Sequence, residues 1–172
     1  MKKLLCSLFA LSAISTAMAQ EVNIKLLGTS DIHGRVVPWS YGADVEDKSG
    51  SYAQIATYVK DVRKNNKNVV LVDVGDAIQD NQVDVFAKDK KYYKDHPIPK
   101  VLNEMKYDVF VLGNHEFNFG MEALDEILKD IKAKKLTANF YYKKNDKRYI
   151  DATTIIEKDG VKLGIIGLST PM

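Results

Sequence analysis

Residues 69–76 read Val-Val-Leu-Val-Asp-Val-Gly-Asp, and the fold can be worked out from this stretch. Aliphatic side chains fill nearly every position from 69 to 74, as in a strand of a parallel sheet that is buried on both faces. Upstream, apolar residues recur at the helical spacing i, i+3, i+4 and i+7. These residues are Tyr52, Ile55, Ala56 and Val59. The polar stretch 63–68 separates the two segments, so we expect a helix followed by a buried strand.

The same alternation continues on both sides. Further strands are expected at 22–27 and 109–112. Helical spacing recurs in two sets, Ile98, Val101, Leu102 and Met105, and Leu124, Ile127, Leu128 and Ile131. This β-α-β-α-β-α order predicts an α/β fold with a mostly parallel sheet covered by helices. Residues 149–157 and 161–168 predict two strands joined by the turn Lys158-Asp159-Gly160, which adds some antiparallel pairing.

Composition and the first residues indicate an exported globular protein. Of the 172 residues, 45% are hydrophobic, which suffices for one domain and excludes a disordered chain. Lys2 and Lys3 precede an apolar run at 4–14, and Ala17-Met18-Ala19 supplies the small residues of a cleavage site. The run is shorter than the roughly 20 apolar residues of a transmembrane helix. We expect residues 1–19 to be a secretory signal peptide and the mature chain to be periplasmic or extracellular.

Removal of that segment changes the charge and the cysteine content. The segment holds two lysines and no acidic residue, so Lys+Arg falls from 25 to 23 against 23 Asp+Glu, and the net charge falls from +2 to zero. A neutral chain offers no electrostatic reason to bind nucleic-acid polymers or anionic membranes. Cys6, the one cysteine, lies in the segment, which excludes a thiolate metal site. The lysine-rich stretches 88–94 and 143–148 are expected to be solvated loops.

Three polar clusters directly follow the first three expected strands. They are Asp31-Ile32-His33, Gly75-Asp76 and Gly113-Asn114-His115-Glu116. Each cluster alone is a weak signal, because Asp-x-His and Gly-Asp are common in turns and Asn-His-Glu can cap a helix. In open α/β sheets, however, ligand sites lie beyond the carboxyl ends of the strands. Together the clusters therefore predict one site.

The ligand types suit two hard or borderline divalent ions. We expect Asp31 and His33 to hold the first ion, Asn114 to hold the second, and Asp76, on the central strand, to bridge them. Two ions about 3.5–4 Å apart can orient a phosphate and activate a water for in-line attack. His115 is expected to be catalytic, either stabilising the phosphoryl charge or protonating the leaving oxygen. The alternative for His115 is a buried, hydrogen-bonded structural histidine.

The three clusters resemble the signature of the calcineurin-like metallophosphoesterases, which runs Asp-x-His, Gly-Asp and Gly-Asn-His-Glu. The resemblance spans nearly the whole mature chain and implies an α/β sandwich with αββα layers and two divalent ions such as Zn, Mn or Co. Further stretches are similar to the secreted nucleotidase branch: 29–34, 75–79, His96-Pro97, 107–120 and 167–171. That branch implies hydrolysis of small nucleotides in nucleotide salvage.

One residue differs from the pattern of the 5′-nucleotidases and favours another group within this branch. Asn118 stands where 5′-nucleotidases of the family usually have an aspartate that pairs with the catalytic histidine. This form, together with His96-Pro97, is similar to the 2′,3′-cyclic-nucleotide 2′-phosphodiesterase/3′-nucleotidase group. A 5′-nucleotidase or UDP-sugar hydrolase is the alternative. A secreted remnant that binds a metal or a nucleotide without hydrolysis is an alternative of another class.

A second departure concerns residues that the family has downstream. The family completes its metal site with a further histidine and a Gly-His-x-His motif, whereas this chain has three histidines, His33, His96 and His115. We likewise do not expect the family's C-terminal nucleotide-binding domain within residues 20–172. We therefore expect residues 20–172 to be the N-terminal part of a metallophosphoesterase domain, truncated before those motifs and inactive in isolation. The missing strands are expected to leave apolar side chains of residues 69–74 exposed.

Overall fold

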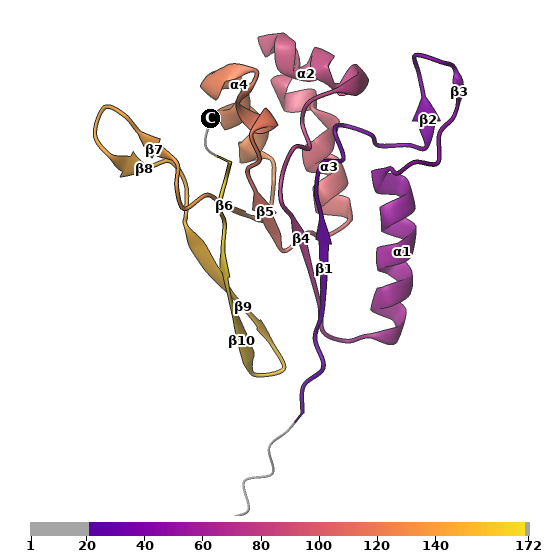
Figure 1. The fold of residues 1–172 in the computed structure, drawn as a ribbon, viewed down its shortest axis with the longest axis vertical. Helices are drawn as coiled ribbons and strands as arrows, with labels where there is room; N and C mark the ends of the chain where they lie inside the picture. Colours follow the sequence, from indigo (N-terminus) through magenta and orange to yellow (C-terminus); the bar gives the residue numbers. More distant parts are fainter. Residues whose placement is uncertain (1–20, 171–172) are drawn as a thin grey trace, which may run out of the picture.

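A computed structural model describes residues 21–170, and the expected signal peptide at 1–19 lies outside the described residues. The centre of the fold is a parallel sheet with strand order β1-β4-β5-β6 (Figure 1). Its strands are β1 (Lys25–Thr29), β4 (Val69–Asp73), β5 (Val109–Val111) and β6 (Lys134–Leu136). Every residue of β4 is buried, as the apolar run predicts. Between residues 21 and 170, no helix has both the length and the apolar composition to cross a bilayer.

The expected helices form and cover one face of this sheet. They are α1 (Tyr52–Asn65), α3 (Pro97–Glu104) and α4 (Gly120–Lys129). Elements that were not expected are α2 (Asp84–Lys88) and the short 3₁₀ helices η1 (Asn81–Val83), η2 (Lys90–Asp95) and η3 (His115–Phe117). Ser51 caps α1, and His96 caps α3 ahead of Pro97 in its first turn. Leu71, Phe110 and Leu112 pack against these helices. The α/β fold class is thus confirmed.

A hairpin covers part of the opposite face of the sheet, over β4, β5 and β6. Its strands are β9 (Thr153–Lys158) and β10 (Val161–Ile166), which pair antiparallel as expected. Asp159 and Gly160 join them with φ values of 47° and 80°, as a two-residue hairpin turn of type I′ requires. Ile156 and Ile165 pack onto a buried cluster of sheet residues. That cluster consists of Val70, Val72, Val109, Val111 and Leu136.

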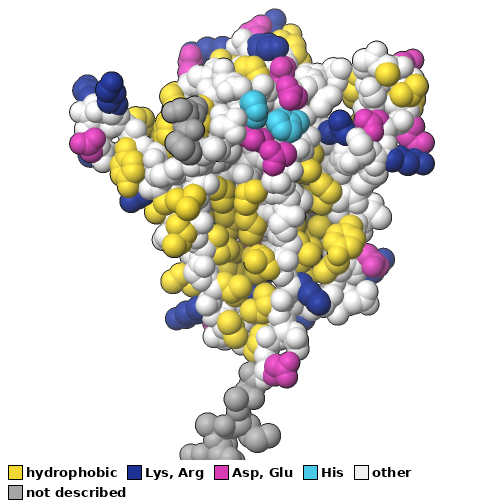
Figure 2. Space-filling view, in the orientation of Figure 1, with side chains coloured by type: hydrophobic (Ala, Val, Ile, Leu, Met, Phe, Trp, Pro, Cys, Tyr) yellow, Lys and Arg dark blue, Asp and Glu magenta, His cyan; other side chains and the backbone are white. Residues whose placement is uncertain are grey.

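The expectation that residues 69–74 expose their apolar side chains is wrong for all but the last valine. Residues 69–72 are buried, because the helices cover one face and the hairpin covers the other. The exposed apolar surface lies at Leu26, Val74, Ile155 and Ile166, which are 49% to 67% exposed. Figure 2 shows hydrophobic side chains on the face between β1 and the hairpin.

Two further expectations change in detail. The first strand spans Lys25–Thr29 instead of 22–27, because its pairing with β4 sets its ends. Residues 88–94 are exposed to solvent as expected, except for the buried Tyr93, but they are not a loop: Lys88 ends α2 and residues 90–94 lie in η2. Two small hairpins complete the chain. These are β2 (Trp39–Ser40) with β3 (Val45–Glu46), and β7 (Tyr141–Tyr142) with β8 (Lys147–Arg148).

Candidate metal centre

The loops that follow β1 and β4 run side by side. Their backbones continue the pairing of the strands: Asp31 donates to the Gly75 carbonyl at 3.0 Å, His33 donates to the Asp76 carbonyl at 2.9 Å, and Gly34 donates to Ala77 at 3.0 Å. The carboxyl ends of adjacent parallel strands meet at one edge of the sheet, so these hydrogen bonds fix the first two polar clusters against each other.

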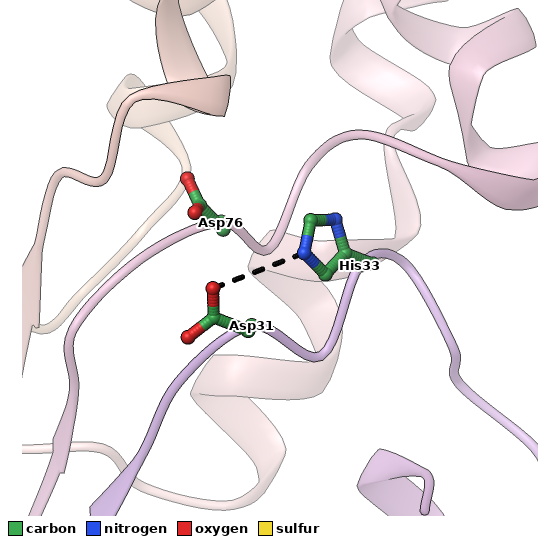
Figure 3. A group of neighbouring side chains, drawn as sticks. All are labelled: Asp31, His33 and Asp76. Atoms are coloured by element: carbon green, nitrogen blue, oxygen red, sulfur yellow. Dashed lines mark ion pairs between the residues drawn. The ribbon is translucent and has the colours of Figure 1, made fainter.

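Asp31, His33 and Asp76 lie close together at this edge, and the Asp31 carboxylate is directed toward the His33 ring (Figure 3). A ligand atom from each lies within 4.8 Å of the others, and Nε2 of His33 is 3.9 Å from Oδ1 of Asp31. Asp76 is buried, whereas the His33 and Asp31 side chains are 30% and 62% exposed, so solvent reaches the cluster from one side. Two carboxylates and an imidazole nitrogen are a donor set that fits borderline divalent ions.

The three residues share an unusual backbone conformation. Asp31, His33 and Asp76 have φ values of 55°, 50° and 57°, in the left-handed region that side chains other than glycine rarely adopt. Each such residue costs on the order of 1 kcal/mol and persists only where surrounding contacts impose it. Here the backbone hydrogen bonds between the two loops impose it, and they thereby aim all three side chains at one point.

Two glycines bring the loop after β5 into contact with the loop after β4. A Cβ atom on Gly75 would lie 2.1 Å from the backbone nitrogen of Gly113, and a Cβ atom on Gly113 would lie 2.3 Å from Oδ1 of Asp76. These separations are far shorter than any van der Waals contact. The close approach of the second and third clusters therefore requires glycine at both positions.

Asn114 and His115 lie beside Asp76. The backbone N–H of His115 donates to Oδ1 of Asp76 at 2.8 Å. Asn114 precedes η3, yet its side chain makes no capping hydrogen bond there, so helix capping does not explain its presence. The structure thus gathers Asp31, His33 and Asp76 into one cluster and holds Asn114 next to it.

The ring of His115 is half-buried and faces the ring of His33, with centroids 5.3 Å apart in a T-shaped arrangement. Its Nδ1 atom lies 2.8 Å from Oε1 of Gln79 and 2.9 Å from Nδ2 of Asn118. Nδ1 is therefore engaged by neutral amide groups, and Nε2 is the ring atom left for other partners.

Glu116 has a role that the sequence did not reveal. Its carboxylate is completely buried and accepts backbone N–H groups from Asp76 at 2.8 Å, Ala77 at 2.7 Å and Gly113 at 2.7 Å. Burial raises the pKa of Glu116 to about 6, although these hydrogen bonds favour the charged form. Glu116 fastens the loop after β4 to the loop after β5. Its place directly after Asn114 and His115 was the available signal.

Asp73 lies directly beneath the site. It accepts hydrogen bonds from Thr29 Oγ1 at 2.7 Å, Tyr52 OH at 3.1 Å and the Gly75 N–H at 2.9 Å. Burial raises the pKa of Asp73 to about 6. Its carboxylate joins β1, α1 and the start of the Gly75 turn. The signal in the sequence was an acidic residue inside an otherwise apolar run.

Comparison with known proteins assigns the chain to a family. The model of the calcineurin-like phosphoesterase family matches residues 24–167. The chain is 36% identical to the trifunctional nucleotide phosphoesterase protein YfkN of Bacillus subtilis, over 89% of this chain and 11% of that protein. It is 32% identical to the 2′,3′-cyclic-nucleotide 2′-phosphodiesterase/3′-nucleotidase of Haemophilus influenzae, over 96% and 27%. It is 34% identical to the snake venom 5′-nucleotidase of Naja atra, over 86% and 28%.

Solved structures agree with this assignment. The crystal structure of the calcineurin-like phosphoesterase YfkN from Bacillus subtilis has a TM-score of 0.75 at 31% identity, covering 86% of this chain and 48% of that one. A putative 5′-nucleotidase from Staphylococcus aureus, at 24% identity and covering 84% of this chain and 28% of that one, shares the fold with a TM-score of 0.74. This chain spans between 11% and 28% of the length of the three curated relatives. The protein belongs to the calcineurin-like phosphoesterase family.

Proposed function

We propose that the protein hydrolyses phosphoesters of nucleotides with two divalent metal ions, in the manner of a 2′,3′-cyclic-nucleotide 2′-phosphodiesterase/3′-nucleotidase. The observation that carries the proposal is the convergence of Asp31, His33 and Asp76, whose ligand atoms lie within 4.8 Å of one another. The phosphoesterase names of the relatives support the reaction class.

The proposed metal ligands come from three neighbouring loops. Asp31 and His33 come from the loop after β1, and Asn114 comes from the loop after β5, on either side of Asp76. Asp76 therefore suits the place of a bridging ligand between two ions. Bound divalent ions would act as Lewis acids on the phosphate and lower the pKa of a bound water. The chain contributes the fixed carboxylates, and the exposed side of Asp31 leaves a path for the substrate.

His115 is proposed as the catalytic residue that is not a metal ligand. Because Gln79 and Asn118 engage Nδ1, Nε2 is free to face a phosphoryl oxygen or a leaving oxygen. At either position it could donate a hydrogen bond, or a proton, as negative charge develops. The backbone hydrogen bond from His115 to Asp76 sets the distance between this ring and the metal cluster.

The choice of substrate rests on Asn118. An amide at this position, paired with Gln79, gives His115 a neutral partner where an aspartate would give it a charged one. The 2′,3′-cyclic-nucleotide phosphodiesterases among the relatives support this choice. The venom relative, at 34% identity, makes a 5′-nucleotidase the second candidate. We also propose export through the segment at 1–19, and nucleotide salvage as the biological role.

The test uses the complete gene product and compares Asp76→Asn with Asp44→Asn. Both aspartates have left-handed backbone, with φ values of 57° and 53°, and Asp44 lies in the exposed turn between β2 and β3. We expect two Mn²⁺ per wild-type chain by titration, and metal-dependent phosphate release. Asp76→Asn should lose both together, and Asp44→Asn should lose neither.

Three outcomes decide against parts of this proposal. Retention of two ions by Asp76→Asn would refute the bridging role. A higher kcat/KM for 5′-AMP than for 2′,3′-cyclic AMP and 3′-AMP would replace the cyclic phosphodiesterase with a 5′-nucleotidase. Metal binding without hydrolysis of any of the three would favour a binding remnant.

A further inference from the structure

Asp80 lies against the ring of His33 on the side away from the metal cluster. Its Oδ2 atom is 3.2 Å from Nδ1 of His33, while Nε2 of the same ring faces Asp31. Nδ1 is buried from solvent and makes no hydrogen bond in this arrangement. A small rotation of either side chain would turn the contact into an N–H···O bond.

The conformation of Asp80 gives no other reason for its presence. It has φ 69° and ψ 153°, which falls close to a region reserved almost wholly for glycine. It precedes η1 but makes no capping hydrogen bond. Within residues 21–170, its carboxylate has no ion-pair partner besides His33. A strained backbone with no stabilising local contact is the pattern of a residue kept for what its side chain does.

The surrounding loop is built to hold this contact. Asn81, also at φ 69°, donates from Nδ2 to the carbonyl of His33 at 2.8 Å. Gly34 lets the two loops meet, since a Cβ atom there would lie 2.6 Å from the carbonyl oxygen of Asp80. The segment after Asp76 thus contacts His33 twice: Asp80 lies against its ring, and Asn81 donates to its backbone carbonyl.

We infer that Asp80 is a positioning residue, which keeps the proton of neutral His33 on Nδ1 so that the lone pair of Nε2 faces Asp31 and Asp76. A neutral imidazole carries its proton on one nitrogen only, and the other nitrogen is the metal ligand. A carboxylate that accepts the proton on the far nitrogen fixes both the tautomer and the orientation of the ring. This inference rests on the proposed function in naming a metal as the partner of Nε2.

Gln79, the residue before Asp80, supports this role for Asp80 by contrast. Gln79 presents a neutral amide to Nδ1 of His115, whereas Asp80 presents a carboxylate to Nδ1 of His33. Adjacent residues of one loop therefore give the two facing histidines different partners. The charged partner makes Nε2 of His33 a stronger electron-pair donor to a metal ion, whereas the neutral partner of His115 has no such effect.

The test combines a variant that relieves strain with two measurements. Asp80→Gly suits the backbone and removes the carboxylate, so the Tm of the metal-free protein should not fall. The Kd for Mn²⁺ should nevertheless rise roughly 10- to 100-fold, the usual cost of losing such a partner. Asp80→Asn retains an acceptor oxygen and should lose less affinity than Asp80→Gly. Asp44→Gly, at φ 53° in an exposed turn, is the matched control and should leave the Kd unchanged.

The second measurement needs no metal. Imidazole ¹H–¹⁵N correlation spectra of the metal-free protein at pH 8 report the tautomer of each of the three histidines. We expect the Nδ1–H form of His33 in the wild type and a shift toward Nε2–H in Asp80→Gly. An unchanged tautomer and an unchanged Kd in Asp80→Gly would overturn the inference while leaving the proposed function intact. If Asp80→Gly shifts the tautomer but the wild-type protein binds no Mn²⁺, the proposed function is refuted and the positioning role of Asp80 stands.

Discussion

The backbone N–H of Asp76 donates a 2.8 Å hydrogen bond to Oε2 of Glu116, and the same oxygen accepts the N–H of Gly113 at 2.7 Å. One buried carboxylate therefore joins the turns after the two central strands. The position of the central residue of the metal cluster is set by a residue 40 positions further along the chain.

Glu116→Gln is expected to lower the free energy of unfolding by about 1–3 kcal/mol. The amide has one acceptor oxygen, and its NH₂ group would face backbone N–H donors, so buried donors would lose their partners. Urea unfolding measures the change. Glu122→Gln on α4, whose side chain is 62% exposed and paired with Lys90, is the control and should change stability little. Equal stability of Glu116→Gln and the wild type would show that Glu116 does not hold the loops after β4 and β5 together.

Gly75→Ala should destabilise the fold by about 2–4 kcal/mol, from backbone strain together with overpacking. Gly75 has φ 96°, and the new Cβ atom would overlap the backbone nitrogen of Gly113. Gly164→Ala is the control, because nothing lies within 4 Å of a Cβ atom there. Thermal unfolding of both variants checks the difference. A Tm for Gly75→Ala as high as that for Gly164→Ala would show that the two turns can separate without cost.

His115→Ala should lower turnover by roughly 10²-fold or more while both metal ions are retained. The hydrogen bond from this residue to Asp76 comes from the backbone N–H, so it survives the substitution. The measurement is kcat together with Mn²⁺ stoichiometry in the complete gene product. Unchanged turnover would mean that His115 is a structural residue and not a catalytic one.

The contribution of His96 to the stability of the protein should fall as the pH decreases from 6.5 toward 4. This side chain is 1% exposed, and burial lowers its pKa to about 4. The unfolded chain takes up the proton near pH 6.5 and the folded chain only near pH 4, so the unfolded state binds more protons in this window. The resulting loss between pH 7 and pH 5 is about 2 kcal/mol.

His96→Asn isolates that contribution, because asparagine can still cap α3 but does not titrate. Urea unfolding at pH 7 and pH 5 should show that this pH change is about 2 kcal/mol less favourable to the stability of the wild type than to that of the variant. Asp73 and Glu116 have raised pKa values, which act in the opposite sense between about 4 and 6. Both residues are present in both proteins, so their effect cancels in the difference. Parallel pH profiles would mean that His96 is protonated in the folded state.

Residues 20–172 alone are expected to bind metal weakly and to hydrolyse nucleotides poorly or not at all. Asp31, His33 and the shared Asp76 would give one ion three protein ligands, whereas Asp76 and Asn114 would give the other only two. Ions held by so few groups exchange readily with water. Mn²⁺ titration and phosphate release from 2′,3′-cyclic AMP, 3′-AMP and 5′-AMP check this. Robust Mn²⁺- or Zn²⁺-dependent turnover would overturn the ligand count.

Much of the fold follows from patterns of neighbouring residues. The apolar run at 69–74 and the spacing that begins at Tyr52 predict β4 and α1, since strand and helix periodicities are local properties. The turn Asp159-Gly160 predicts the hairpin of β9 and β10 for the same reason. By contrast, β6 carries two lysines in three residues and exists because β5 offers it an edge.

The sequence by itself determined which side chains meet at the metal cluster, because Asp31, His33 and Asp76 follow strands whose carboxyl ends must lie at one edge of a parallel sheet. Only the tertiary structure decided how they are held. Glu116 and Asp80 act through partners from other loops, and their effect depends on burial and on distances that no local pattern encodes. The positions of the strands along the chain follow from hydrophobic periodicity. The hydrogen bonds of a buried charge depend instead on what the completed fold brings within about 3 Å of it.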